Sequence, residues 1–65
     1  MTVDYRALIK SKRLERKWSQ AQLAKAVDIS QPYLYEIECG RKTPSLDVFF
    51  RLCEELGIRL FPDEP

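Results

Sequence analysis

The stretch SQAQLAKAVDISQPYLYEIECG, residues 19–40, contains the start and stop signals of two short helices separated by a tight turn. Ser19 can cap the first helix by accepting a hydrogen bond from an amide of the first turn, and Gln22, three residues on, completes a capping box. In the segment 28–30, Asp28 is a residue that tolerates turn conformations and Ser30 can cap a second helix. The first helix therefore has room for about eight residues.

The second helix of this stretch begins at Ser30. Pro32 falls within its first turn, where the missing amide costs nothing and the fixed φ suits a helix. Gly40 directly follows Cys39 and is able to adopt the left-handed conformation that ends many helices. The sequence therefore predicts a helix-turn-helix unit over residues 20–39.

The inward positions of this unit indicate how its two helices cross. Ala24 is small enough for two helices to cross steeply at close range, and Ile29, Leu34 and Ile37 fill the space behind the crossing. The opposite face of the second helix stays free, and it forms a ridge narrow enough for the major groove of DNA, which is about 12 Å wide. The residues expected on this ridge are Gln31, Pro32, Tyr33, Tyr35 and Glu36.

Helical signals also precede and follow the unit. Residues 4–16 carry apolar side chains at helical spacing among many Lys and Arg, which predicts a basic amphipathic helix. Ser45 caps a further helix over residues 46–56, and Gly57 closes it.

The last residues leave three structures open. Residues 58–61, which Pro62 ends, fit a strand, a turn of helix or a packed arm. A chain of 65 residues has room for one domain only. We expect a compact all-α domain of four to five helices over residues 1–65, with a C-terminal arm over residues 58–65.

The net charge of +1 conceals a gradient along the chain. Residues 1–27 carry seven Lys and Arg against two acidic residues, a net charge of +5, whereas residues 28–44 sum to −1 and residues 45–65 to −3. If the protein binds nucleic acid, the positive residues 1–27 are the part expected to contact phosphates. The charges alone do not distinguish a nucleic-acid-binding surface from an ordinary solvated surface on which both signs are mixed.

Composition excludes several other classes of protein. With 45% hydrophobic and 32% charged residues, the chain is typical of an ordinary globular protein. No apolar run approaches the roughly 20 residues of a membrane span, and residues 1–10 do not resemble a secretory signal. We therefore expect a cytoplasmic protein without a membrane partner.

The two cysteines, Cys39 and Cys53, are too far apart for a CxxC motif, and the chain contains no histidine. We expect both to be reduced and to act as small packing residues. The sequence offers no carboxylate pair in a plausible pocket either. Neither a metal site, nor a cofactor, nor an enzymatic activity is expected.

Three motifs carry a resemblance to a known family. They are Ile9-Lys10-Ser11-Lys12-Arg13, Ser19-Gln20-Ala21-Gln22-Leu23-Ala24 and the run from Ile37 through Glu38-Cys39-Gly40-Arg41-Lys42-Thr43-Pro44 to Ser45. Together they resemble the Cro/C1-type (Xre) family of helix-turn-helix transcriptional regulators, over residues 5–57. The resemblance implies a lambda-repressor-like fold and binding to double-stranded operator DNA.

The resemblance assigns roles at matching positions. Arg13 and Glu38 match a structural ion pair that ties the first helix to the end of the third, and we expect it to be partly buried. Gln20 resembles the first-turn glutamine of the second helix, whose side chain and amide meet a phosphate. Gln31 matches the leading base-reading position, where a carboxamide suits adenine. Trp18 takes the large apolar position before the cap and is expected to pack in the core.

The helix 31–39 contains no Lys or Arg, so phosphate attraction has to come from Arg41, Lys42 and the basic first helix. Three positions depart from the family pattern. Asp28 stands where the family has a turn glycine, although aspartate enters the left-handed region readily. Pro32 and Glu36 stand at contact positions where the family has glutamine or a basic residue, and Glu36 either accepts from a cytosine amino group or is tolerated. The expected DNA contacts are Gln20, Ser30, Gln31, Pro32, Tyr33, Tyr35, Glu36, Arg41 and Lys42.

The helix 46–56 has more apolar surface than one core needs, covering about 200° of its circumference. The excess indicates a homodimer, in which two recognition helices about 34 Å apart would contact a palindrome. The expected interface residues are Val48, Leu52, Ile58, Leu60 and Phe61. The alternative is a tail folded back on its own domain.

Tails of this kind also resemble those of antitoxin-type regulators. Two functions therefore stay open: a dimeric repressor or autoregulator, and a module that neutralises a toxin through its apolar C-terminal surface. A protein partner would be such a toxin or a component of the transcription machinery.

Overall fold

The structure is a computed structural model that describes residues 4–59. Within this range the chain forms four helices and no strand: α1 (Tyr5–Glu15), α2 (Gln20–Ala26), α3 (Gln31–Cys39) and α4 (Leu46–Leu56). The expected all-α, lambda-repressor-like architecture is confirmed. None of these helices is long and apolar enough to cross a membrane. Leu60, Phe61 and the rest of the predicted arm beyond Arg59 lie outside the described residues.

Each helix starts at a residue whose side chain accepts hydrogen bonds from first-turn amides. Ser19 Oγ accepts from the amide of Gln22 at 3.1 Å, and Gln22 Oε1 accepts from the amide of Ser19 at 2.8 Å, which is the expected capping box. At the starts of α3 and α4, the hydroxyls of Ser30 and Ser45 accept from the amides of Tyr33 and Val48. Asp4, which the sequence analysis did not identify as a cap, accepts from two amides of α1.

Left-handed residues end the helices. Gly40 at φ 83° and Gly57 at φ 69° follow α3 and α4, as expected, and Asp28 at φ 61° follows α2. Lys17 at φ 58° was not anticipated. After α1, the amide of Trp18 donates to the carbonyl of Arg13 at 3.1 Å, so this end closes in a Schellman motif without glycine.

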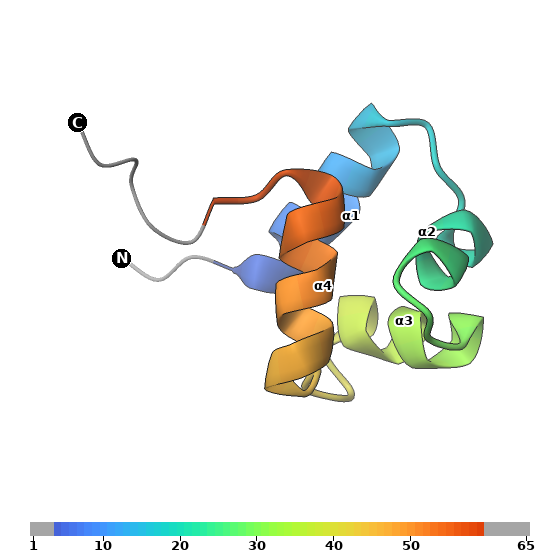
Figure 1. Ribbon diagram of the computed structural model, residues 1–65. Coiled ribbons are helices and arrows are strands. Elements are labelled where there is room, and N and C mark those ends of the chain that lie inside the picture. The colour runs from blue at the N-terminus through green and yellow to red at the C-terminus, as the bar shows by residue number, and fades with distance from the viewer. Residues whose placement is uncertain (1–3, 60–65) are drawn as a thin grey trace.

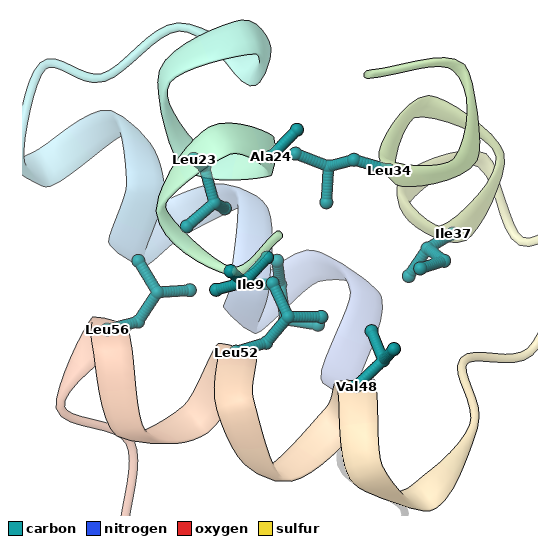
Figure 2. Close-up of a cluster of buried hydrophobic side chains, with 9 residues drawn as sticks. Ile9, Leu23, Ala24, Leu34, Ile37, Val48, Leu52 and Leu56 are labelled. Atoms are coloured by element: carbon teal, nitrogen blue, oxygen red, sulfur yellow. The ribbon is translucent and has the colours of Figure 1, made fainter. Parts of the chain in front are cut away.

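The four helices enclose one apolar core. α1 packs against both α3 and α4, and α2 packs against α3, so that α2 and α3 lie together on one side of the molecule (Figure 1). Figure 2 shows apolar side chains from all four helices converging on a common centre. The core residues are Ile9, Leu23, Ala24, Val27, Leu34, Ile37, Val48, Leu52 and Leu56. Ala24 lies where α2 meets α3, as its small size predicts.

The orientation of α4 corrects two of the predicted interface residues. Val48 and Leu52 are buried in the chain's own core, so they have no surface to offer a second copy. They lie one turn apart on the side of α4 that faces the core (Figure 2), because a helix repeats every 3.6 residues. The apolar excess lies on the other side, where Leu46 and Phe50 are 68% and 48% exposed.

Substitution of Leu52 by alanine should lower the free energy of unfolding by about 2 to 5 kcal/mol, because it removes a fully buried side chain and leaves a cavity. Urea denaturation followed by circular dichroism measures this loss. Leu14→Ala is the control, since Leu14 is a leucine of α1 that is 55% exposed, and it should change the stability by less than about 0.5 kcal/mol. Equal losses in the two variants would contradict the orientation of α4.

Candidate nucleic-acid interface

The carboxylate of Glu38 fixes α3 relative to α1. Arg13 Nε donates to Glu38 Oε2 at 2.9 Å and Arg13 Nη2 donates to Glu38 Oε1 at 3.1 Å, a bidentate pair whose side chains are only 8% and 4% exposed. Arg13 Nη1 also donates to the carbonyl of Trp18 at 2.9 Å. The structural ion pair expected from the sequence is therefore present, and it is more fully buried than expected.

Gln20 joins this network from the first turn of α2. Its Nε2 donates to Glu38 Oε1 at 3.1 Å, so the amide group points toward the ion pair. Both the side chain and the backbone amide of Gln20 were expected to meet a phosphate. The amino group of the side chain is engaged inside the protein, and a phosphate contact by the backbone amide at the start of α2 stays a prediction.

The turn between α2 and α3 is held by a residue that the sequence analysis did not identify. Arg51 of α4 donates through Nη1 to the carbonyl of Val27 at 2.8 Å, directly before the left-handed residue Asp28. Its Nη2 donates to Asp47 Oδ2 at 3.0 Å. The four-residue spacing of Asp47 and Arg51 is a detectable signal for that ion pair, whereas nothing in the sequence indicates the contact with Val27.

The start of α3 forms the exposed ridge that the sequence predicts. Gln31 and Pro32 are exposed in its first turn, and Tyr35 is 49% exposed one turn further along. Ser30 Oγ accepts from the amide of Tyr33 at 3.2 Å, so Ser30 acts as the cap of this helix. Leu34 and Ile37 point the other way, into the core.

The two tyrosines of α3 differ in their surroundings. Tyr33 is half-buried against the core, and its hydroxyl accepts from the amide of Ser45 at 3.3 Å, so that it braces α3 against the start of α4. Tyr35 is the more exposed of the two. A hydrogen bond with Cys39 raises the pKa of the Tyr35 hydroxyl. A DNA contact by either ring stays a prediction.

The cysteines also differ from each other. Cys53 is buried, and burial raises the pKa of its thiol, as suits a packing residue. Cys39 is exposed in the last turn of α3, so the expectation that it acts as a small packing residue is wrong. Trp18 is partly buried against the core as expected, and the guanidinium carbon of Arg16 lies 5.8 Å from the centre of its ring.

The loop after α3 carries the two cations expected to meet phosphates. Arg41 and Lys42 are exposed, and their amides donate to the carbonyl of Glu36 at 2.9 and 3.3 Å. Lys42 Nζ lies 3.5 Å from Glu36 Oε1. Arg6 of α1 adds a third cation here, because its guanidinium occupies the space that a Cβ at Gly40 would need. The sequence predicts that the first helix is basic, but it does not indicate which Lys or Arg of α1 reaches this loop.

Together these features define a helix-turn-helix domain: two short helices locked across a tight turn, the second with an exposed start and a cationic loop behind it. A family model described as Helix-turn-helix matches residues 9–61. The chain belongs to the Cro/C1-type (Xre) family of helix-turn-helix DNA-binding transcriptional regulators.

Several phage and bacterial proteins are similar to this chain. It is 43% identical over 60 residues to the immunity repressor protein of Bacillus phage phi105, covering 92% of this chain and 40% of the repressor. It is 46% identical over 54 residues to the ImmF control region 10 kDa protein of the same phage, covering 83% and 60% of the two chains. An uncharacterized HTH-type transcriptional regulator of Bacillus subtilis (strain 168), YqaF, is 38% identical over 53 residues, which make up 82% of this chain and 70% of YqaF.

The matched regions thus span less than two thirds of both phage relatives. No solved structure is significantly similar to the chain. The family is shown by sequence, and the arrangement of the site comes from the geometry described above.

Replacing Glu38 by glutamine should lower the free energy of unfolding by about 3 to 5 kcal/mol, because the buried guanidinium of Arg13 loses its counter-charge. Urea denaturation at neutral pH measures the loss. Glu15→Gln provides the matched control, since Glu15 pairs with Lys12 at 3.9 Å on the surface of α1. That substitution should cost less than about 1 kcal/mol. A Glu38→Gln variant as stable as the control would rule out a supporting role for the pair.

Proposed function

We propose that this chain binds a palindromic operator in double-stranded DNA as a homodimer and represses transcription by occupying a promoter, its own included. The first turn of α3 enters the major groove. The observation that carries the proposal is the exposure of Gln31 at the start of α3, the family's leading base-reading position, on a helix whose other face is locked into the core. The similarity to a phage immunity repressor supports repression as the mode of action.

Attraction and base reading come from different parts of the surface in this proposal. α3 has no Lys or Arg, so its contacts select a sequence without drawing the protein to phosphates. Arg41, Lys42 and the neighbouring Arg6 supply positive charge beside α3. Binding is therefore expected to weaken steeply with salt while the preference for the operator persists.

Selection of bound fragments from random DNA tests the proposal and supplies the operator. On that operator, Gln31→Ala should lose about 1 to 3 kcal/mol of binding free energy, because the carboxamide is the expected partner of a base edge. A duplex of scrambled sequence is the control, and binding to it should hardly change. Equal losses on both duplexes would remove Gln31 from base contact, and failure to select any sequence would overturn the proposed function.

The dimer is supported by the exposed side of α4. Leu46 and Phe50 lie one turn apart on it, and Phe49, between them, makes an edge-to-face contact with Tyr5 at 5.6 Å between ring centres. Of the interface residues expected from the sequence, Ile58 is partly buried against the core, and Leu60 and Phe61 are outside the described residues. Leu46 and Phe50 take the place of Val48 and Leu52 in the proposed interface. The antitoxin-type alternative depends on the same C-terminal residues outside the described range.

Phe50→Ser should shift the protein from dimer toward monomer and abolish cooperative binding to the two halves of the palindrome, because it removes an exposed aromatic anchor from the interface. Sedimentation equilibrium of the free protein and gel-shift titration measure the two effects. Leu14→Ser is the matched control, since Leu14 is an exposed apolar residue on α1. A wild-type protein that stays monomeric both free and on the operator would contradict the dimer.

A further inference from the structure

The charges of α3 are unusual for a helix that approaches DNA. It has two acidic residues and no basic one. Glu38 is buried in the ion pair with Arg13, so its charge is neutralised inside the protein. Glu36 is consequently the acidic group that α3 presents at its surface, with its side chain 33% exposed.

This exposed carboxylate is paired with a cation that the proposed function assigns to phosphate. Glu36 Oε1 lies 3.5 Å from Nζ of Lys42, whose side chain is 57% exposed. The backbone of Lys42 is anchored to the same residue, because its amide donates to the carbonyl of Glu36 at 3.3 Å. The backbone of the loop is thus held beside α3, while the exposed side chain of Lys42 can exchange one partner for another.

Two acceptors compete for this ammonium group when DNA approaches. If Lys42 stays with Glu36, the pair is neutral and contributes little attraction. If Lys42 turns to a phosphate oxygen, the Glu36 carboxylate is left unpaired close to the phosphates and is repelled by them. Either outcome weakens binding to any duplex, whatever its sequence. The cost can be offset only where the DNA itself offers a hydrogen-bond donor to the carboxylate, as the amino group of a cytosine does in the major groove.

We propose that Glu36 is a specificity-determining residue, which lowers the affinity for non-cognate DNA by holding Lys42 in an ion pair and by repelling phosphates. At the operator, the amino group of a cytosine donates a hydrogen bond to the Glu36 carboxylate. The ammonium group of Lys42 then binds a phosphate of the DNA backbone. This inference rests on the proposed binding to operator DNA, and it adds that an attractive contact is withheld until the correct sequence is met.

Glu36→Gln tests the proposal, because glutamine keeps the size of the side chain and removes its charge. The variant should bind a scrambled duplex about fivefold more tightly than the wild type and should lose at least the same factor in its preference for the operator. The slope of log affinity against log salt on the scrambled duplex should become steeper by up to about one, since Lys42 is then free to meet one more phosphate. Fluorescence anisotropy titrations at several salt concentrations give all three quantities.

Two controls separate this mechanism from a general effect of net charge. Glu54→Gln makes the same change in net charge at an exposed position on α4 and should leave affinity for the scrambled duplex within about twofold of the wild type. The second control repeats Glu36→Gln in a Lys42→Ala background. There the gain should shrink to about twofold or less, because the cation that Glu36 restrains is absent.

The possible results decide between the inference and the function on which it rests. If the wild type prefers its operator but Glu36→Gln leaves that preference unchanged, the specificity role is wrong and the proposed function stands. An equal gain with and without Lys42 would also overturn the role, because the ion pair would then be irrelevant. If the wild type shows no sequence preference at all, the proposed function itself fails.

Discussion

The carboxylate of Glu38 lies where three helices meet, and it accepts hydrogen bonds from Arg13 on α1 and from Gln20 on α2. Removing these groups from water is costly, and a lone buried charge in so small a core would be destabilising. The cost is offset because the guanidinium binds the carboxylate through two nitrogens and its third nitrogen, Nη1, donates to the carbonyl of Trp18. A purely apolar contact would tolerate some sliding of α3 against α1 and α2. Directional hydrogen bonds to one carboxylate fix its position instead, and the exposed ridge depends on that position.

Burying Glu38 also decides what α3 presents to a ligand. With that charge neutralised inside, the exposed residues of the helix are Gln31 and Pro32 in its first turn, Tyr35 one turn further along and Cys39 in its last turn. The carboxylate of Glu36 is the charge that the helix presents beside them. Such a surface can distinguish base edges but attracts phosphates weakly. Positive charge comes from the loop after Gly40 and from Arg6, whose guanidinium rests against that glycine. A Cβ at position 40 would collide with Arg6 and would strain a backbone at φ 83°, so the glycine both ends α3 and lets the two cationic segments meet.

The sequence predicts the helices and their ends well, because caps such as Ser19 and Gly57 act through neighbouring residues. It predicts contacts between helices less well. The apolar arc of α4 is visible in the sequence, but its width does not reveal which edge faces inward, and Val48 was assigned to the wrong side. Cys39 was expected to be a packing residue from its residue type alone, but it is exposed. The Arg13–Glu38 pair was found because the family resemblance joins two residues 25 positions apart, which no local pattern does.

Glu36 has two separable roles, one of its backbone carbonyl in holding the loop and one of its side-chain carboxylate in the electrostatics of the surface. Its carbonyl holds the amides of Arg41 and Lys42, and this backbone contact does not depend on the nature of the side chain. Its carboxylate pairs with the ammonium group of Lys42 and meets the charges of an approaching ligand. A substitution at this position therefore alters the electrostatics of the ridge while the backbone contact of the loop is kept. Affinity for DNA in general can then change without a change in the fold, because the stability of the domain depends on the Arg13–Glu38 pair and the apolar core, and Glu36 belongs to neither.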